Sequence, residues 1–495
     1  MDDDDLLARS PTDWIRKLEP RLRDQAEHAE LHDSFYSGDR RLLLVERDFR
    51  DIFNGLLDSV RVNLSRIVVD ARVERLAIDG FAVDDDDGAD AVDANRVART
   101  AAAIWRRNQL DEMAGIAHLE RAIKAVSFGV VWPDDDDRAT VSIEDATQMV
   151  VERRPWPPYD VVAAMKVWED DWDGTRFCEL YLPDGIHRFV GGKRLAGELW
   201  VPSSVRIASG WRPAPGTDVN GRDGRNPFGG LVPVVELTTR ARLLKDPQSD
   251  LYDIAPLHDA YDVTMAQLVI AGNFSAIPIH TIAGAIIRVD KDGNPVDEDG
   301  NPTRPFDKRG DRNWVSPDKD TKFGTLQPGN LGEIIKTRAE ILTGVRGLSR
   351  VPIHYFDLGG TSGVGAEMLK ALEGPLVRAM AAEERALGPQ WARLQQLALT
   401  IESPDLARAP LRTAWADTET RADSQDADAF SKFHTAGVPL DEAMRRAGFG
   451  ERAIRHAVEL NAHLLAGDDR QDGLDLPTPP RRGPTTPVPA PPPAA

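Results

Sequence analysis

The sequence lacks most of the features that mark secreted and membrane proteins. Its 495 residues include one cysteine, Cys178, so no internal disulfide can form and a reducing cytoplasm is indicated. No apolar run approaches the roughly 20 residues that a membrane-spanning helix needs. The first residues, Met1 to Asp5, have neither the basic region nor the apolar core of a signal peptide. We therefore expect no export and no membrane association.

Basic residues are also scarce. Lys and Arg number 61 against 81 Asp and Glu, which gives a formal net charge of -20 and a pI near 5.0. Tight phosphate binding requires clustered Lys and Arg, so this balance argues against a broad basic face that grips nucleic acid. This acidic charge balance is compatible with a protein along which DNA moves without being bound, although many soluble proteins have a similar balance.

A complete nucleotide-binding motif is missing. The stretch from Gly360 to Gly365 imitates the glycine spacing of a phosphate-cradling loop, but Ala366 and Glu367 follow it instead of Lys-Ser or Lys-Thr. A mobile loop with glycine hinges is the better interpretation. We expect no cofactor and no enzymatic activity.

Candidate metal sites are incomplete in the same way. Asp290, Asp292 and Asn294 occupy the first three ligand spacings of a calcium loop. The sixth position is Pro295 instead of Gly, and the twelfth is Asn301 instead of Glu. A turn is the simpler interpretation of this segment.

Two further groups of possible ligands also have simpler interpretations. His28 and His32 lie one helical turn apart, but Glu30 between them matches neither common zinc-protease order. The acidic run from Asp170 to Asp173 has no histidine beside it and precedes Gly174. We expect a solvated helix face and a surface loop, and no metal.

The sequence does contain a long helical block from Ser249 to Thr400. Two amphipathic helices are predicted over about 250–274 and 331–348, because apolar residues recur at three- and four-residue steps. These residues are Leu251, Ile254, Leu257, Tyr261, Met265 and Leu268 in the first helix and Ile334, Ile335, Leu342, Val345 and Leu348 in the second. Asp250 and Asp253 are expected in the first turn, where they complement the helix dipole. The antiparallel pair suits a ring subunit around a pore, and it equally suits an ordinary core.

Turn signals dominate the excursion between these helices. The sequence Asp-Gly-Asn-Pro occurs twice, at 292–295 and 299–302, and such signals predict a β-hairpin or small β subdomain. Beyond the second helix a glycine-rich loop leads to a third helical run from Ala366. Pro375 and Pro389 fall inside that run, so we expect it to be kinked or broken.

The N-terminal half combines helices with β structure. We expect helices over 12–32, 51–69 and 92–128, and strand character over 68–76. From Val130 to about Glu236 short apolar runs alternate with turn signals, which predicts strands. The fold class expected for the chain is therefore α+β, mainly helical, with two to four domains.

The C-terminal part is expected to be helical and then disordered. Residues 403–466 are predicted to form a compact helical unit, in which 438–460 has helix-turn-helix texture. Arg452, Arg455 and His456 stand against Glu451 and Glu459 on its second helix, which favours packing over DNA reading. The last residues, 478–495, are rich in proline and low in complexity.

Taken together, several short motifs resemble the portal proteins of tailed double-stranded DNA bacteriophages, and most closely the Gp6-like group of long-tailed phages. The resemblance covers roughly residues 15–465 and depends on the order and spacing of its motifs. They are Asn63–Asp70, Arg75–Leu76, Gly80–Phe81, Trp105–Asp111, Gly230–Val235, Ser362–Gly363, Ala366–Leu369 and Glu373.

The resemblance implies a portal fold that forms a ring of usually twelve subunits. Its parts would be a wing over 1–247, stem helices over 248–277 and 331–350, a clip over 278–330, a tunnel loop with a kinked long helix over 351–402, a crown over 403–468 and a disordered tail over 469–495. Members of the family admit DNA during packaging and release it on infection. The implied partners are the terminase large subunit, head-completion or adaptor proteins, and the major capsid and scaffolding proteins. The implied location is the portal vertex of the virion, after assembly in the host cytoplasm.

The resemblance also assigns two groups of residues. The tunnel loop would line the DNA channel through His354, Tyr355, Phe356, Asp357, Leu358, Gly359, Gly360, Thr361 and Ser362, and the clip would dock partners through Asp292, Asn294, Asp299 and Asn301. From Val351 to Val364 there is no Lys or Arg and a single acid, Asp357. Such a lining offers phosphates no strong counter-charge, so a duplex could slide along it. We expect His354, Tyr355 and Phe356 at or near the narrowest part of the channel.

Two other classes of function stay open at the level of sequence. A helix-turn-helix regulator built on residues 438–460 would bind duplex DNA in a salt-sensitive way. A nuclease or NTPase of phage origin would need a carboxylate cluster or a complete phosphate loop, and neither is found in the sequence.

Overall fold

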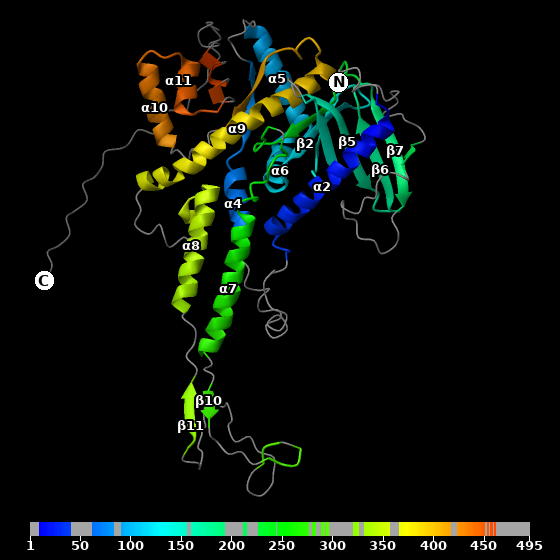
Figure 1. The fold of residues 1–495 in the computed structure, drawn as a ribbon. Coiled ribbons are helices and arrows are strands. Elements are labelled where there is room, and N and C mark those ends of the chain that lie inside the picture. Colours follow the sequence, from blue (N-terminus) through cyan, green and yellow to red (C-terminus); the bar gives the residue numbers. More distant parts are fainter. Residues whose placement is uncertain are drawn as a thin grey trace, which may run out of the picture. The chain divides into compact units, whose positions relative to one another are not determined.

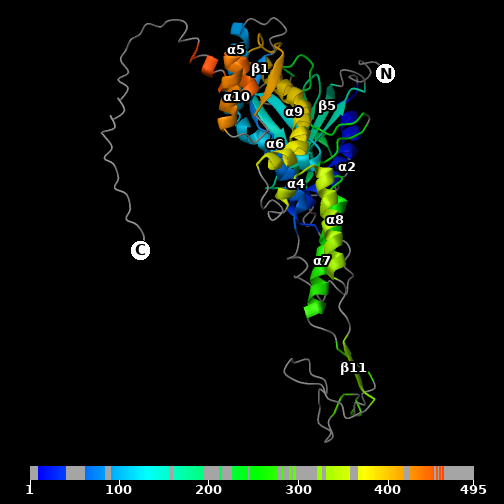
Figure 2. The ribbon, with the colours of Figure 1, turned by 90° about the vertical axis from the view of Figure 1, so that its left-hand side faces the viewer.

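The computed structural model contains two compact units, residues 1–420 and 421–495, shown as a ribbon in Figures 1 and 2. Each unit is described by itself. The residues described are 9–40, 62–83, 91–155, 160–193, 211–214, 226–243, 245–276, 280–283, 289–292, 294–296, 320–325, 331–356, 366–416, 423–450, 453–454, 456–458 and 460–461.

The described residues at the start of the first unit form the helices α2 (Pro11–Ser37), α4 (Leu64–Val73), α5 (Ala91–Arg107) and α6 (Leu110–Lys124). Helix α2 starts where Ser10 accepts a hydrogen bond from the Asp13 backbone N–H, and it ends at Gly38 with φ of 81°. The helix expected over 12–32 is confirmed. The single helix expected over 92–128 is two helices, separated at Gln109, whose φ is 53°.

The strand character expected over 68–76 is wrong, because α4 occupies these positions as far as Val73. The Asn63 side chain caps α4 by accepting from the Arg66 N–H at 2.9 Å. The strand follows later, as β1 (Ile78–Val83), and pairs antiparallel with β12 (Leu411–Trp415). Strand β12 also shows that the expectation of an entirely helical segment over 403–466 is wrong.

Besides β1–β12, two larger antiparallel sheets lie in the described part of the N-terminal half. The smaller has the order β3 (Ala139–Glu144), β2 (Ser127–Pro133), β9 (Val234–Leu237). The larger has the order β4 (Met149–Arg153), β5 (Val161–Glu169), β6 (Thr175–Tyr181), β7 (Ile186–Lys193), β8 (Arg212–Pro213). Helix α2 covers the larger sheet, and the buried side chains of Trp14, Ile15 and Leu18 pack in one cluster with Met165 and Leu180. The strands predicted between Val130 and Glu236 are confirmed for the described residues.

The largest core lies under α9 (Ala366–Glu402), which runs as one helix past Pro375 and Pro389. The helix is therefore not broken at either proline, and the alternative of a kink stays a prediction. Trp391 of α9 packs edge-on against Trp105, with ring centroids 5.4 Å apart. Gly129 of β2 lets α9 approach closely, because a Cβ there would lie 2.7 Å from Cδ1 of Leu394.

The predicted pair of long helices is confirmed. Helix α7 (Ala255–Ala276) and helix α8 (Leu331–Ser349) lie side by side, and Figures 1 and 2 show them extending away from the sheets. Beyond them β10 (His280–Ala283) and β11 (Lys322–Thr325) pair antiparallel. Because residues 284–321 separate the two strands, they agree with the predicted small β subdomain and not with a simple hairpin. The residues expected to flank the turns, Ile286, Ile287, Trp314 and Val315, lie outside the described part of the chain.

The second unit contains α10 (Asp423–Thr435) and α11 (Leu440–Ala447). Phe430 of α10 packs edge-on against Phe449, with ring centroids 5.9 Å apart. Helix α11 ends at Gly448, whose φ is 93°. Across both units, none of the helices in the described ranges combines the length and apolarity needed to cross a bilayer.

Glu19 gives the fold a pH dependence. Its side chain is 1 % exposed against the larger sheet, and neither carboxylate oxygen makes a hydrogen bond to a described residue. Burial raises its pKa to about 7 from 4.5, and Arg23 and Arg176 offset only part of this effect. The folded state therefore binds a proton that the unfolded chain has lost, and the stability that this proton contributes declines as the pH rises from about 4.5 to 7.

We predict that Glu19→Gln raises the free energy of unfolding by about 1–2 kcal/mol at pH 8 and changes it little at pH 4. Urea denaturation of both proteins at the two pH values measures this. Glu27→Gln is the matched control, because Glu27 lies exposed on the same helix. Equal pH dependence in the Glu19→Gln variant and the wild type would contradict the prediction.

Candidate functional site

Among the described residues, buried charged side chains are most concentrated where α7 and α8 join the rest of the first unit. At this root the two helices are closely packed: a Cβ on Gly344 of α8 would lie 3.4 Å from Cδ1 of Leu257 of α7. Val345 and Ile254 are buried there. Further out the helices become exposed, and Ile335 has 46 % of its surface in solvent. The root therefore fixes the direction of the helical pair.

Three arginines and two acids meet at this root. Asp250 pairs through Oδ2 with Arg121 Nη1 at 3.1 Å and with Arg72 Nε at 3.3 Å, and through Oδ1 with Arg240 Nε at 3.0 Å. Glu383 of α9 pairs with Arg121 Nη2 at 2.8 Å and with Arg72. Apart from Arg240, all of these side chains are almost completely buried. We call these five residues the root cluster.

The carboxylate of Asp250 is held in its charged form. Burial by itself raises the pKa of Asp250, but the charges of Arg121, Arg72 and Arg240 outweigh burial, and the pKa lies below its usual value. Burial likewise lowers the pKa of Arg72, but Asp250 and Glu383 raise it above the usual value. The cluster is therefore a set of paired ions, because an unpaired charge in this position would be very costly.

The root cluster connects segments that are far apart in the sequence. The Asp250 N–H donates to the Ala122 carbonyl at the end of α6, at 2.9 Å. Arg72 Nη1 donates to the Ser349 carbonyl at the end of α8, at 3.3 Å. The beginning of α7 and the end of α8 are thus attached to α4, α6 and α9. Displacing the helical pair would separate several buried ion pairs together.

The sequence pattern predicts a different place for Asp250 and does not indicate the other members of the root cluster. Asp250 was expected in the first turn of the helix, but α7 begins at Ala255 and Asp250 lies in the turn before it. Arg121 and Glu383 occupy positions that helical periodicity assigns to the buried face, beside Ala117 and Met380. A charged residue at such a position is the one signal in the sequence that could have identified them.

Three of the predicted channel-lining residues lie just past α8, in and beside the 3₁₀ helix η4 (Ile353–Tyr355). Arg75 Nη2 donates to Tyr355 Oη at 3.0 Å and to Glu373 Oε2 at 3.1 Å. His354 Nε2 lies 3.3 Å from Glu373 Oε1. We call Arg75, His354, Tyr355 and Glu373 the anchor cluster. Because Glu373 belongs to α9, this cluster connects the residues before the segment 357–365 with the residues after it.

His354, Tyr355 and Phe356 are half-buried, and the two latter side chains pack against the main core. The remaining predicted lining residues, Asp357 to Ser362, lie outside the described part of the chain, as do Asp299 and Asn301. Asp292 and Asn294 are exposed, and their backbone N–H groups donate to Asp290 Oδ1 at 2.9 and 2.8 Å. Asp290 therefore closes a turn, as expected of this segment.

A serine, a histidine and an aspartate also meet beside the root. Ser65 Oγ lies 2.6 Å from His258 Nδ1, and His258 Nε2 lies 3.7 Å from Asp262. His258 Nε2 donates to the Val62 carbonyl at 2.9 Å, so Nδ1 is the acceptor for Ser65. Burial, and then the charge of Arg40, lowers the pKa of His258 to about 4. Ser65 is fully buried, so no substrate reaches it, and the group fastens α4 to α7.

The acidic run predicted to be a loop forms the turn between β5 and β6. Asp170 Oδ1 accepts from the Trp172 N–H and Asp173 Oδ1 accepts from the Thr175 N–H, both at 2.9 Å. These carboxylates therefore shape the backbone of the turn. Among the described residues no group of three or more His, Cys, Asp or Glu side chains is arranged to hold a metal ion.

Comparison with known proteins matches residues 16–450 to the family model of the phage portal proteins, SPP1 Gp6-like. The portal protein of Mycobacterium phage D29 is 24% identical over 451 residues, which covers 86% of this chain and 84% of that protein. The portal protein of Mycobacterium phage L5 is 24% identical over 464 residues, which covers 88% and 85%.

The root cluster is expected to make the stability of the first unit sensitive to the loss of a single charge. We predict that Asp250→Ala lowers the free energy of unfolding by about 3–5 kcal/mol, because it leaves buried guanidinium groups without their shared partner. Asp253→Ala is the matched control: its carboxylate is 56% exposed and lies 3.8 Å from Arg240, so the loss should stay below about 1 kcal/mol. Chemical denaturation measures both, and similar losses in the two variants would contradict the prediction.

Proposed function

The chain belongs to the phage portal proteins of the SPP1 Gp6-like family, and on this premise we propose that its copies close into a ring around a channel for double-stranded DNA. The family is structural rather than catalytic, and its place is the capsid vertex of a virion. The observation that carries the proposal is the family match over residues 16–450, which includes the helical pair and the root cluster.

We assign the parts of the portal to the elements as follows. The wing is 1–247, the stem is α7 and α8 within 248–277 and 331–350, and the clip is 278–330, which contains β10 and β11. The tunnel loop and long helix are 351–402, the crown is 403–468 and the tail is 469–495. Strand β12, inside the proposed crown, pairs with β1 of the proposed wing and belongs to the first unit.

The surface of α7 supports assembly with other copies. Leu268, Val269 and Ile270 are consecutive and each is half-buried. Successive residues of a helix point about 100° apart, so these side chains cannot all face α8. The part of these side chains that stays exposed can face a second apolar neighbour, and in a ring the adjacent copy supplies it through a heterologous contact. We expect about twelve copies, as is usual in the family.

The anchor cluster gives the proposed channel lining a fixed base. His354 and Tyr355 are held through Arg75 and Glu373, so the residues just before the proposed lining segment 357–362 have a position that the core determines. This segment contains no Lys or Arg. A lining without counter-charges for phosphate would let the duplex slide during packaging and ejection.

We further propose the partners of the ring. The terminase large subunit and the head-completion or adaptor proteins would dock at the clip, near Asp292, Asn294, Asp299 and Asn301, and the major capsid and scaffolding proteins would surround the ring. Assembly would take place in the host cytoplasm. The exposure of Asp292 and Asn294 agrees with a docking role.

Electron microscopy of the purified protein tests the ring directly. We expect hollow particles whose central opening is wide enough for a DNA duplex. Particles without such an opening, both in the isolated protein and in virus heads, would refute the proposed function.

The anchor cluster leads to a second prediction about the channel. Glu373→Gln weakens the contacts to Arg75 and His354, and should cost about 1–2 kcal/mol of stability while rings still form. We expect the rate of DNA packaging to fall, because the flanks of 357–365 are no longer held together. Glu333→Gln, at an exposed position on α8, is the control. Packaging at the wild-type rate in a Glu373→Gln ring would show that the anchor has no role in translocation.

A further inference from the structure

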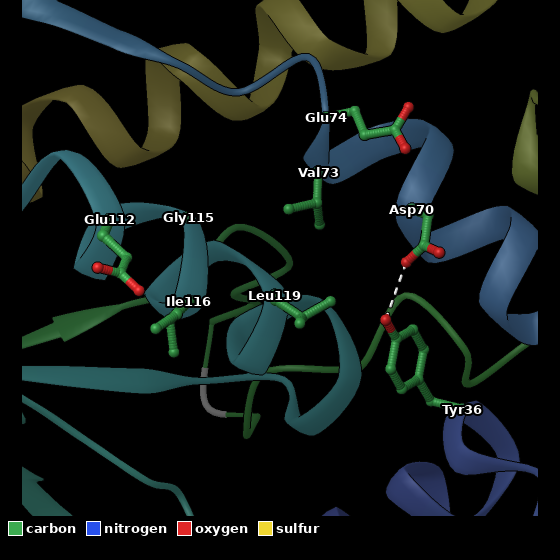
Figure 3. Close-up of a pocket in the computed structure, with 8 residues that line it drawn as sticks. All are labelled: Tyr36, Asp70, Val73, Glu74, Glu112, Gly115, Ile116 and Leu119. Carbon is green, nitrogen blue, oxygen red and sulfur yellow. Dashed lines mark hydrogen bonds between the residues drawn. The ribbon is translucent and has the colours of Figure 1, made fainter.

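A groove of about 400 Å³ lies on the first unit between α4 and α6. Its apolar lining consists of Val73 from α4 on one side and of Ile116 and Leu119 from α6 on the other, as Figure 3 shows. Ile116 is 40 % exposed. Gly115 widens the groove, because a Cβ at this position would have no other atom within 4 Å. A protruding apolar side chain would fit this space.

The rim of the groove is acidic. Glu74 and Glu112 are exposed on opposite sides of it, and Asp70 adds a third carboxylate. Asp70 already accepts a hydrogen bond from Tyr36 Oη at 2.9 Å and lies 3.5 Å from Arg66 Nε. Glu74 and Glu112 are therefore the charges that an incoming group would meet. An apolar tip flanked by basic residues is the complementary shape and charge.

The same chain carries such a tip between β9 and α7. Leu243 is 86 % exposed at the apex of a turn, which the Lys245 N–H closes by donating to the Arg242 carbonyl at 3.2 Å. Arg242 and Lys245 are exposed beside it, followed by the exposed Asp246. The base of the turn is fixed, because Arg240 pairs with Asp250 of the root cluster at 3.0 Å.

The groove and the Leu243 turn lie toward opposite faces of helix α6. Glu112 and Ile116 point into the groove, whereas Arg121 donates to Thr239 Oγ1, just before the turn, at 2.9 Å. Arg121 follows Glu112 by nine residues, which is two and a half turns at about 3.6 residues per turn. A chain with complementary surfaces on opposite faces can join head to tail with identical copies.

We propose that the Leu243 turn of one copy inserts into the α4–α6 groove of the next copy, so that Arg242 and Lys245 meet Glu74 and Glu112. This contact rests on the ring proposed above and names residues that hold neighbouring copies together. It is heterologous, as closure of a ring requires. An apolar anchor surrounded by charged residues is also the arrangement in which few side chains provide most of the binding energy.

Charge exchange in the full-length protein tests the contact. Glu74→Arg with Glu112→Arg, and separately Arg242→Glu with Lys245→Glu, place like charges opposite each other. Each pair of substitutions should raise the protein concentration needed for ring formation by about tenfold or more. All four substitutions together restore opposite charges and should restore rings. Analytical ultracentrifugation and negative-stain images measure ring formation, and circular dichroism confirms that each variant is folded.

Leu243→Asp tests the apolar part of the contact and should also prevent ring formation. Trp172→Asp is its control, because Trp172 is 95 % exposed at the turn between β5 and β6, away from both surfaces. The proposal is overturned if the charge variants and Leu243→Asp assemble like the wild type, or if the folded fourfold variant fails to recover. A wild-type chain that forms no ring would instead overturn the proposed ring, and the contact with it.

Discussion

The ion pairs of the root cluster are the constraint on which the rest of the first unit depends. Asp250 and Glu383 each bridge two arginines from different helices, so α4, α6, α9 and the beginning of α7 share one electrostatic unit. Burial makes every member dependent on its partners, because a single unpaired charge would be poorly solvated. The direction in which α7 and α8 leave the unit is therefore decided by charge pairing, whereas the apolar core supplies the bulk of the stability.

The periodic parts of the fold could be predicted from the sequence, and the contacts between distant residues could not. Apolar repeats correctly indicated α2, α7 and α8. The β-branched run in α4, Ile67 to Val69, imitated a strand, but the Asn63 cap and burial of Val68 and Val69 favour a helix. Strand β12 escaped detection because its partner β1 lies far away in the sequence.

In the candidate site, too, the position of residues along the chain could be predicted, whereas their contacts with distant residues could not. The resemblance directed attention to His354 and Tyr355, and the structure shows what holds them, namely Arg75 and Glu373. Both residues belong to the motifs that carry the resemblance, but nothing in those motifs indicates that the two side chains meet. Arg72 and Glu383 are separated by 311 positions, and no pattern within one helix reveals such a pair. In this protein the charged side chains of the site form ion pairs and hydrogen bonds with residues far away in the sequence, and short sequence motifs do not reveal those partners.

The pairing of β1 with β12 has a consequence for how the protein is made. Strand β1 lies within the first 83 residues, and its partner ends at Trp415. During synthesis β1 can pair with β12 only after most of the polypeptide has left the ribosome. A product terminated before residue 411 therefore leaves the edge of β1 without its partner strand, and such an exposed edge can pair with other chains.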